Sequence, residues 1–216
     1  MGETRQVEVD GKELRLTNLD KLLYPEAGFT KGEMVDYYAK VAPAIVPHLR
    51  GRAVTLRRFP EGVDDLEAAF FEKRCPKHRP KWVKTTRVQA GPNAGKIDFC
   101  VCDILPTLIW MAQLIAKQTP DEVLAKMGKK TDRSGKVLID WYQNNERKTT
   151  IAVYSLRARE RPTCSTPVTW EEVEQAAGSG DGSHLVFETT DVLKRLDDHG
   201  DLFAPVLELE QALPEL

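Results

Sequence analysis

The segment from Lys136 to Arg159 places the strongest constraint on the fold. An apolar run, Val137 to Ile139, ends at a single carboxylate, Asp140, and after a polar turn a second β-rich run extends from Thr149 to Leu156. Two such runs around a polar turn predict a pair of adjacent strands. One acid beside amides and arginines suits a metal ion and a phosphate chain. The same residues equally suit an ordinary hairpin with a salt-bridged turn.

The rest of the chain mixes short strand patterns with helix patterns. Asp10-Gly11 between two β-rich runs predicts an N-terminal hairpin. Thr30 and Glu33 form a capping box, which predicts a helix from Lys31 towards Ala44. Because strands and helices do not alternate regularly, we expect an α+β fold, a mixed sheet with flanking helices. The other predicted elements are strands at Ala53–Phe59 and Ile97–Cys102 and helices at Thr107–Ala116, Trp170–Ala177 and Asp191–Asp198.

Several long stretches, spread over nearly the whole chain, carry a family resemblance. They are Leu16–Pro25, Ala69–Pro80, Val137–Asn145 with Lys148–Arg159, and Gly200–Glu208. They closely resemble the polymerase domain of bacterial ligase D, which belongs to the archaeo-eukaryotic primase superfamily and repairs double-strand breaks by non-homologous end joining. The resemblance implies a single domain over residues 1–216 with a shortened primase-polymerase-like fold.

One part of the family pattern is missing. The family carries two catalytic aspartates as Asp-x-Asp on a strand, followed by a Ser-Gly-x-Lys-Gly-like loop. This chain has fifteen aspartates, none spaced as Asp-x-Asp, and no such loop. The sequence matches the family up to Leu105–Leu114 and resumes at Thr119–Val123. The resemblance therefore implies an internal deletion near residues 116–118, with both flanks intact.

The net charge of −2 conceals a strong asymmetry along the chain. Seven lysines and arginines and no acid lie between Lys73 and Arg87, whereas twelve acids and two bases lie between Glu171 and Leu216. A polyanion would bind the basic stretch and be repelled by the acidic one. A solvated charged face is the alternative interpretation of such a run.

Hydropathy excludes some classes of protein. No apolar run approaches the roughly 20 residues that span a bilayer, and the first residues lack the apolar core of a signal peptide. We therefore expect a cytoplasmic protein with no membrane partner. Four cysteines without a secretory signal predict reduced thiols.

The opening stretch holds candidates for DNA-end recognition. Asn18, Lys21 and Lys31 match the family positions that hold the 5′-phosphate of a recessed end. Two ammonium groups and an amide can clasp a phosphate dianion. Lys31 also lies in a first helical turn, where free N–H groups attract anions. As residues alone, the two lysines equally suit a solvated surface.

The aromatic pair Phe70-Phe71 holds candidates for DNA contact. Adjacent side chains on a strand point to opposite faces, so one ring can be buried while the other stacks on an unpaired base. In the family this pair contacts the template strand, whereas the structural alternative buries both rings in the core. The basic residues that follow would track the DNA backbone without reading bases: Lys73, Arg74, Lys77, Arg79, Lys81 and Lys84.

The resemblance implies a nucleotide site as well. Arg57, Arg58, Gln143 and Arg157 match positions near the incoming triphosphate, and Asp140 matches the third catalytic aspartate, a ligand of Mn²⁺ or Mg²⁺. Two-metal phosphoryl transfer needs several carboxylates. One retained aspartate therefore predicts turnover that is lost or very low.

A zinc site is an alternative use of the cysteines. Cys75, His78, Cys100 and Cys102 provide four ligands of suitable type. The Cys-x-Cys spacing is tight, and thiols on a strand are more often buried apolar groups. Zinc is therefore disfavoured.

Together these patterns predict a DNA-end-binding protein of non-homologous end joining that does not polymerise alone. Its expected ligands are double-stranded ends with a 5′-phosphate, and a DNA ligase and an end-binding repair protein are candidate partners. The alternative is an active gap-filling nucleotidyltransferase, a DNA polymerase or primase with remodelled or partner-supplied carboxylates. A decayed gene product without a role is a third interpretation.

Overall fold

The computed structural model describes residues 4–59, 63, 69–91, 94–115 and 149–210. Asp140, Gln143 and the strand expected to end at Asp140 lie outside the described residues. The α+β class is confirmed, because helices and strands are both present. The described strands form four small antiparallel sheets, where one mixed sheet was expected.

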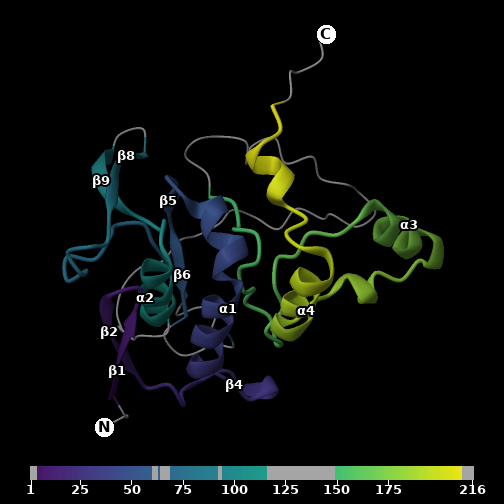
Figure 1. The fold of residues 1–216 in the computed structure, drawn as a ribbon, viewed down its shortest axis with the longest axis horizontal. Coiled ribbons are helices and arrows are strands. Elements are labelled where there is room, and N and C mark those ends of the chain that lie inside the picture. The colour runs from purple at the N-terminus through teal and green to yellow at the C-terminus, as the bar shows by residue number, and fades with distance from the viewer. Residues whose placement is uncertain (1–3, 60–62, 64–68, 92–93, 116–148, 211–216) are drawn as a thin grey trace.

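The N-terminal hairpin is confirmed. Strands β1 (Thr4–Val9) and β2 (Lys12–Thr17) pair antiparallel, with Val9 opposite Lys12. Asp10 and Gly11 both have positive φ, 47° and 68°, which gives the two-residue turn that matches the twist of a hairpin. Figure 1 shows this hairpin beside α2 (Leu105–Ile115), which β2 contacts.

Helix α1 (Lys31–Leu49) is the centre of the fold, with α2 on one side and α4 on the other (Figure 1). The capping box is present, since Thr30 N donates to Glu33 Oε2 at 2.7 Å and Glu33 N donates to Thr30 Oγ1 at 3.3 Å. The helix extends past the predicted end at Ala44, through Pro43 and Pro47, because its later turns are also buried. Core burial here outweighs the local preference of proline against helix interiors.

The region from residue 53 to 59 is divided between two sheets. Strand β5 (Ala53–Val54) pairs with β9 (Ala94–Val101), which also pairs with β8 (Thr85–Gly91). Strand β6 (Leu56–Arg58) pairs instead with β7 (Phe70–Glu72). The prediction of one continuous strand over Ala53–Phe59 is therefore wrong, because the chain changes partner at Thr55.

The remaining elements surround α1. The short strands β3 (Leu22–Tyr24) and β4 (Phe29–Thr30) pair just before it. Glu188 N donates to Asp191 Oδ2 at 2.9 Å, so the last α-helix begins at Thr189, before the predicted start at Asp191. The helices are α2 (Leu105–Ile115), α3 (Trp170–Ser179) and α4 (Thr189–His199), and the 3₁₀ turns are η1 (Pro25–Ala27), η3 (Ser183–Leu185) and η4 (Ala204–Leu207).

The prediction of a strand at Thr149–Leu156 is wrong. The segment is irregular, with one isolated bridge between Leu156 and Cys164. Its backbone bonds partly to residues 163–165, with Tyr154 N donating to the Ser165 carbonyl at 2.7 Å, and partly to tyrosine hydroxyls on α1. Tyr37 donates to the Tyr154 carbonyl at 2.6 Å, and the backbone N–H of Leu156 donates to the Tyr38 hydroxyl at 3.2 Å.

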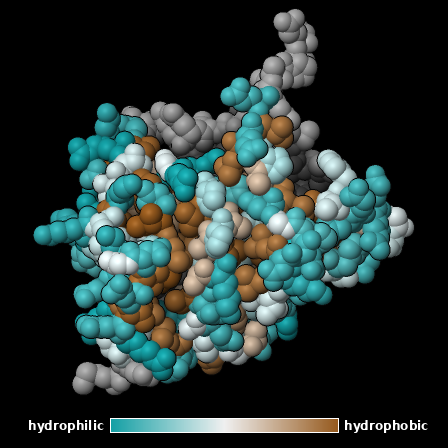
Figure 2. All heavy atoms as spheres, in the orientation of Figure 1, coloured by the Kyte–Doolittle hydropathy of each residue, from teal (hydrophilic) through white to brown (hydrophobic). Residues whose placement is uncertain are grey.

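The hydrophobic core is built mainly on α1. Val41 and Ile45 are fully buried, and residues of β2, β3, β9 and α2 pack around them. The space-filling view shows apolar residues near the centre of the molecule, with hydrophilic residues around them (Figure 2). None of the described helices combines the length and hydrophobicity that crossing a bilayer requires.

Candidate nucleic-acid interface

The loop before α1 brings Asn18, Lys21 and Lys31 together. The backbone N–H of Lys31 donates to the Lys21 carbonyl at 2.8 Å, and that of Gly32 donates to the Leu19 carbonyl at 2.8 Å. Asn18 is exposed in the left-handed region at φ 54°, and its carbonyl accepts a bond from Lys21 N at 3.1 Å. The loop is therefore fixed against the first turn of the helix, with Asn18 exposed and Lys21 half-buried.

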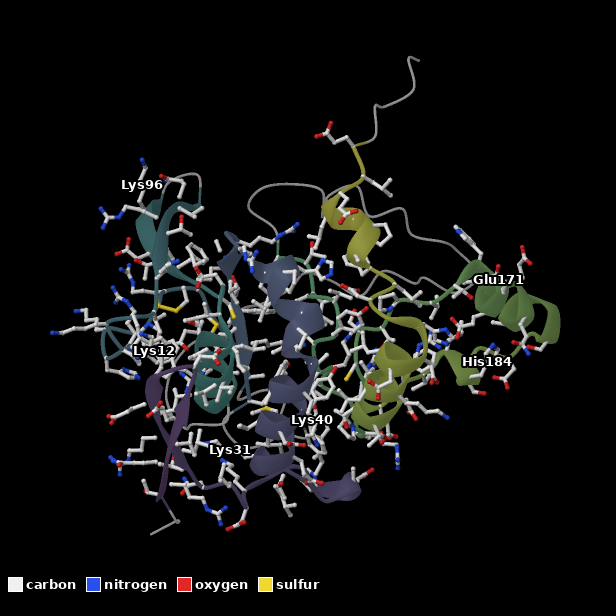
Figure 3. The ribbon with its side chains drawn as sticks, viewed as in Figure 1. Lys12, Lys31, Lys40, Lys96, Glu171 and His184 are labelled. Atoms are coloured by element: carbon white, nitrogen blue, oxygen red, sulfur yellow. A yellow bond between two sulfur atoms is a disulfide. The ribbon has the colours of Figure 1, made fainter. Side chains whose placement is uncertain are left out.

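Lys31 differs from the other two residues because it is fully buried. Its Nζ donates to the Thr17 carbonyl at 2.6 Å, which ties the end of β2 to the start of α1 (Figure 3 labels Lys31). The expectation of free N–H groups in this first turn is wrong. The N–H groups of Lys31 and Gly32 bind loop carbonyls and that of Glu33 binds the Thr30 hydroxyl.

The ribbon of β6 and β7 joins residues that the sequence assigned to separate sites. Arg57 lies opposite Phe71, and Arg58 lies opposite Phe70. The guanidinium carbon of Arg57 is 5.7 Å from the ring centroid of Phe71 and 4.9 Å from that of Phe59. A candidate nucleotide residue and a candidate DNA residue thus form one cation–π pair.

The two phenylalanines have different environments. Phe71 is 52% exposed, whereas Phe70 is half-buried, as expected for neighbours that point to opposite faces of a strand. Arg58 is buried, with Nη1 3.1 Å from Glu72 Oε2 and its guanidinium carbon 5.4 Å from the Phe70 centroid. On this ribbon, Phe71 and Arg57 face solvent while Arg58 stabilises the opposite side.

The basic segment, defined as residues Lys73 to Lys84, follows β7 directly. Five of its cations are exposed and Arg79 is half-buried. Lys84 Nζ lies 2.6 Å from Asp103 Oδ2. On the neighbouring strands, Arg87 Nε lies 2.8 Å from Asp98 Oδ1 and lowers the pKa of that carboxyl, with smaller contributions from Arg79 and Arg74. The basic segment lies beside the β8–β9 ribbon, since Cys75 N donates to the Asp98 carbonyl of β9 at 2.7 Å.

The expectation that all four thiols are reduced is wrong. Cys75 and Cys100 form a disulfide, while Cys102 and Cys164 are free. Burial raises the pKa of both free thiols to about 12, so they remain protonated at neutral pH. Two of the four candidate zinc ligands are bonded to each other. Throughout the described ranges, no three His, Cys, Asp or Glu side chains converge on a point where they could hold a metal ion.

Arg57 lines a small cavity of about 70 Å³, whereas Arg157 does not line it although its neighbours Leu156 and Ala158 do. Arg57, Phe59, Tyr38 and Leu156 contribute to its lining, whereas Arg157 follows the last of these in sequence. The Tyr24 hydroxyl donates to the Arg157 carbonyl at 2.9 Å. The cavity has room for a few waters but is too small for a nucleotide.

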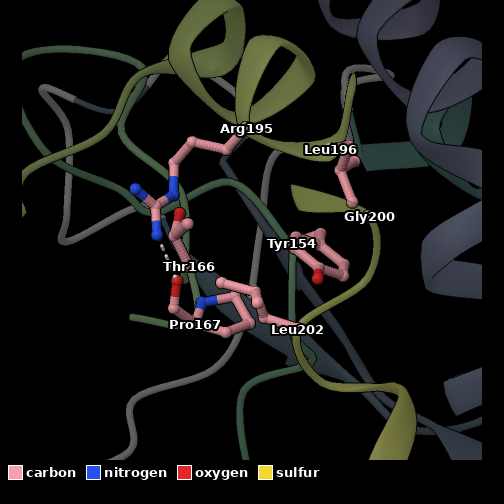
Figure 4. A pocket seen from close by; sticks show the side chains of 7 residues that line it. All are labelled: Tyr154, Thr166, Pro167, Arg195, Leu196, Gly200 and Leu202. Carbon is pink, nitrogen blue, oxygen red and sulfur yellow. Dashed lines mark hydrogen bonds between the residues drawn. The ribbon is translucent and has the colours of Figure 1, made fainter. Parts of the chain in front are cut away.

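Two polar clusters were not found from the sequence. In the first, Arg195 Nη2 donates to the Pro167 carbonyl at 3.2 Å (Figure 4). It also donates to Glu172 Oε2 at 2.9 Å, and the guanidinium carbon lies 4.3 Å from the Phe187 ring centroid. Arg195 lowers the pKa of Glu172 to about 2. This cluster joins α3 to α4 beside a cavity of only about 10 Å³, so its role is structural.

The second cluster is centred on Asp201. Its Oδ2 lies 2.8 Å from His48 Nε2, and its Oδ1 accepts bonds from the Tyr154 hydroxyl at 2.6 Å and from Phe203 N at 2.9 Å. Burial alone would raise the pKa of Asp201, but the donors on Tyr154, His48 and Phe203 lower it overall. In the sequence, only the family-like stretch Gly200–Glu208, which contains Asp201, pointed to this part of the chain.

Comparison with known proteins connects this geometry to a family. The family model described as "LigD, primase-polymerase domain" matches residues 30–116 and 111–203. The multifunctional non-homologous end joining protein LigD of Mycolicibacterium smegmatis is 30% identical over 283 residues, which cover 89% of this chain and 36% of that protein. Its namesake from Mycobacterium bovis is 28% identical, over 87% of this chain and 36% of that protein. The chain thus spans about a third of the length of these relatives.

A solved structure shows the same fold. The polymerase domain of Mycobacterium tuberculosis ligase D, solved in complex with DNA, aligns with a TM-score of 0.71 and 24% sequence identity. The alignment covers 89% of this chain and 97% of that one. These findings confirm the resemblance seen in the sequence. The chain belongs to the LigD primase-polymerase domain family.

Proposed function

We propose that this protein binds DNA ends during non-homologous end joining. The observation that carries the proposal is the exposed Phe71 ring, paired with Arg57 and followed directly by the basic segment. An aromatic platform beside a cationic track suits an unpaired base next to a phosphate backbone. The names of the relatives and the DNA bound to the structural neighbour support the same ligand class.

The basic segment supplies a sequence-independent part of this interface. Its exposed cations would contact phosphates, and such contacts fix position without reading bases. Affinity for duplex DNA should therefore fall steeply with salt and change little with base sequence. A complex that resists salt, or that selects one sequence among several, would contradict the proposal.

The loop before α1 is proposed as the site for a 5′-phosphate. Asn18 is exposed and Lys21 is partly so, and both are held in place by backbone bonds to α1. Lys31 is proposed to hold this loop rather than to touch the phosphate in this conformation, because its ammonium is buried against Thr17. Lys21 and Asn18 then provide the direct contacts.

An end-phosphate comparison tests this site. Removing the 5′-phosphate from a gapped duplex should weaken binding by about tenfold, because charge-assisted contacts are worth roughly 1.5–3 kcal/mol each. Lys21→Ala should abolish most of that difference and leave binding to the unphosphorylated duplex nearly intact. Equal affinity of the unmodified protein for the phosphorylated and unphosphorylated duplexes would exclude this loop as a 5′-phosphate site.

We further propose that the chain is one domain with an internal deletion and that it does not polymerise alone. The alignment with the M. smegmatis relative runs over 283 residues although this chain has 216, which supports missing internal residues. Mn²⁺ or Mg²⁺ would need several carboxylates, and only Asp140 matches the family's three. The described residues offer no group of ligands that could complete such a site.

The polymerase test uses purified protein, a recessed 5′-phosphorylated gap, manganese and ribonucleotides. We expect no extension above background. Extension that disappears in Asp140→Ala would instead support the second candidate, an active nucleotidyltransferase whose remaining acids are remodelled or supplied by a partner. A DNA ligase and an end-binding repair protein are the partners to add in that assay.

A further inference from the structure

The disulfide between Cys75 and Cys100 lies at the start of the basic segment (Figure 3). We infer that these two cysteines form a reversible redox pair whose oxidation orders the basic segment for contact with a DNA backbone. The inference rests on the proposed DNA binding and adds that the redox state of these cysteines regulates it.

Both ends of the basic segment are anchored near β9. At the start, Cys75 is bonded to Cys100 in β9, and its backbone N–H donates to the Asp98 carbonyl at 2.7 Å. At the end, Val83 is buried, and the backbone N–H of Val101 donates to the Lys84 carbonyl at 3.0 Å. The residues between these anchors form a loop that β9 holds at two points.

The loop between the anchors is where the cations are concentrated. Lys77 and Lys81 are exposed, Arg79 is half-buried, and Arg74 lies next to the bonded cysteine. Arg79 N donates to the Pro76 carbonyl at 3.2 Å, a bond within the loop itself. Cations held this close repel one another. The anchors therefore oppose an electrostatic tendency of the loop to expand.

Reduction would remove the covalent anchor at one end. The Cys75–Asp98 backbone bond and the burial of Cys75 would then have to hold that end against the mutual repulsion of the cations. A loop that is less ordered before binding loses more conformational entropy when it binds. The reduced protein should therefore bind DNA more weakly than the oxidised protein.

The chemistry is thiol–disulfide exchange with a low-molecular-weight disulfide such as oxidised glutathione. The thiolate of Cys75, on the segment that can move, attacks one sulfur of the small disulfide and displaces a thiolate. The thiolate of Cys100 then attacks the sulfur of Cys75, which closes the protein disulfide and releases the second small thiolate. Two protein thiols are oxidised, the small disulfide is reduced to two thiols, and the two protons pass to them.

The binding test compares the full chain after oxidation with oxidised glutathione and after reduction with dithiothreitol. Fluorescence anisotropy with a gapped, 5′-phosphorylated duplex should give an affinity about five- to tenfold higher for the oxidised protein. Cys164→Ala, which removes a free cysteine outside the pair, should keep this difference. The double variant Cys75→Ser/Cys100→Ser should bind like the reduced protein in both buffers.

Limited trypsin digestion tests the order of the loop without DNA. Cleavage after Lys77 and Lys81 should accelerate at least severalfold on reduction, whereas cleavage at sites outside the basic segment should not. Mass spectrometry of the fragments separates this local change from global unfolding, which would raise cleavage everywhere.

The outcomes distinguish the two proposals. Equal DNA affinity in both redox states, with equal cleavage after Lys77 and Lys81, overturns the redox inference while leaving DNA binding intact. Absence of DNA binding in both states contradicts the proposed function, and the digestion still decides whether the disulfide orders the loop. A reduced protein that binds more tightly than the oxidised one also overturns the inference.

Discussion

At the scale of single residues, exposure separates side chains that the sequence presents as equivalent. Phe70 and Phe71 are identical and adjacent, but only Phe71 is exposed for more than half of its surface. Lys21 and Lys31 were expected to act together, yet Lys31 is fully buried and Lys21 is half-buried. A side chain can contact a ligand directly only where the fold leaves it accessible, so in each pair one side chain is more accessible to a ligand than the other.

Phe71→Ala should lower affinity for a gapped duplex by about tenfold, because stacking of a base on an aromatic ring is worth roughly 1–3 kcal/mol. The measurement is anisotropy at fixed salt. Trp170→Ala is the matched control, since Trp170 is also an exposed aromatic residue (79%) but lies on α3 among acids. Equal losses in the two variants would show that the effect is not specific to the β6–β7 ribbon.

Lys31→Ala should lower the free energy of unfolding by about 2–4 kcal/mol, because it leaves a cavity and deprives the partly buried Thr17 carbonyl of a donor. Chemical denaturation measures the change. Lys21→Ala should stay within about 1 kcal/mol of the unmodified protein, as expected for a partly exposed site. A Lys31→Ala protein of unchanged stability that no longer distinguishes phosphorylated ends would make Lys31 a phosphate ligand instead.

At the scale of elements, α1 organises the described segments that follow residue 148. Tyrosines on or beside it hold the backbone of residues 154–157, and His48 near its end contacts Asp201. Asp201 also binds Tyr154, so one carboxylate links the helix, the irregular segment and the turn that leads into η4. The segment is thereby held in place without belonging to a sheet.

The Asp201 cluster predicts a loss of stability in acid. The pKa of Asp201 is lower in the folded protein than in an unfolded chain, so ionised Asp201 favours folding above the unfolded value of about 4. That contribution is lost as pH falls through the lower folded pKa. Thermal melting between pH 7 and pH 3 should show a decline that is smaller in Asp201→Asn. An identical pH dependence in both proteins would show that other carboxylates dominate.

At the scale of the whole molecule, the described chain is a family domain built from small sheets around one central helix. In Figure 1, the β8–β9 ribbon and α3 extend on opposite sides of that helix. The basic segment lies with the ribbon, and the acidic residues of α3 lie on the other side. The charge asymmetry of the sequence is thus also a spatial asymmetry, which would orient the molecule on a polyanion.

Reduction of the disulfide should lower the stability of the whole domain. Cys75 and Cys100 are 25 residues apart, and closing a loop of this size stabilises a fold by about 3 kcal/mol in the chain-entropy description. Denaturation with and without dithiothreitol measures the difference. The Cys75→Ser/Cys100→Ser variant should match the reduced protein and show no response to reductant. A redox-independent unfolding midpoint would mean that the bond constrains little of the unfolded chain.

The sequence by itself determined the features that depend on near neighbours in the chain. The capping box at Thr30 and Glu33 begins a helix because its two bonds lie within one turn. The Asp10-Gly11 turn pairs two strands that it directly joins. Opposite orientation of Phe70 and Phe71 follows from the geometry of a single strand. Family membership also needed only the literal sequence, because it rests on long matching stretches.

Only the tertiary structure decided which polar and apolar groups meet across long separations. Lys31 is buried with its ammonium against the Thr17 carbonyl at the end of β2, and the chain leaves one sheet for another at Thr55 because β5 pairs with β9 and β6 pairs with β7. Residues 149–156 are irregular, and their backbone bonds go to tyrosine hydroxyls on α1 and to the backbone of Ser165. Cys75 meets Cys100 where a loop packs on β9, and Arg57 meets Phe71 across the β6–β7 pair, and no local pattern specifies either contact. Which side chains are buried, and which groups contact one another, depends on the packing of segments distant in sequence. Local sequence signals carry no information about that packing.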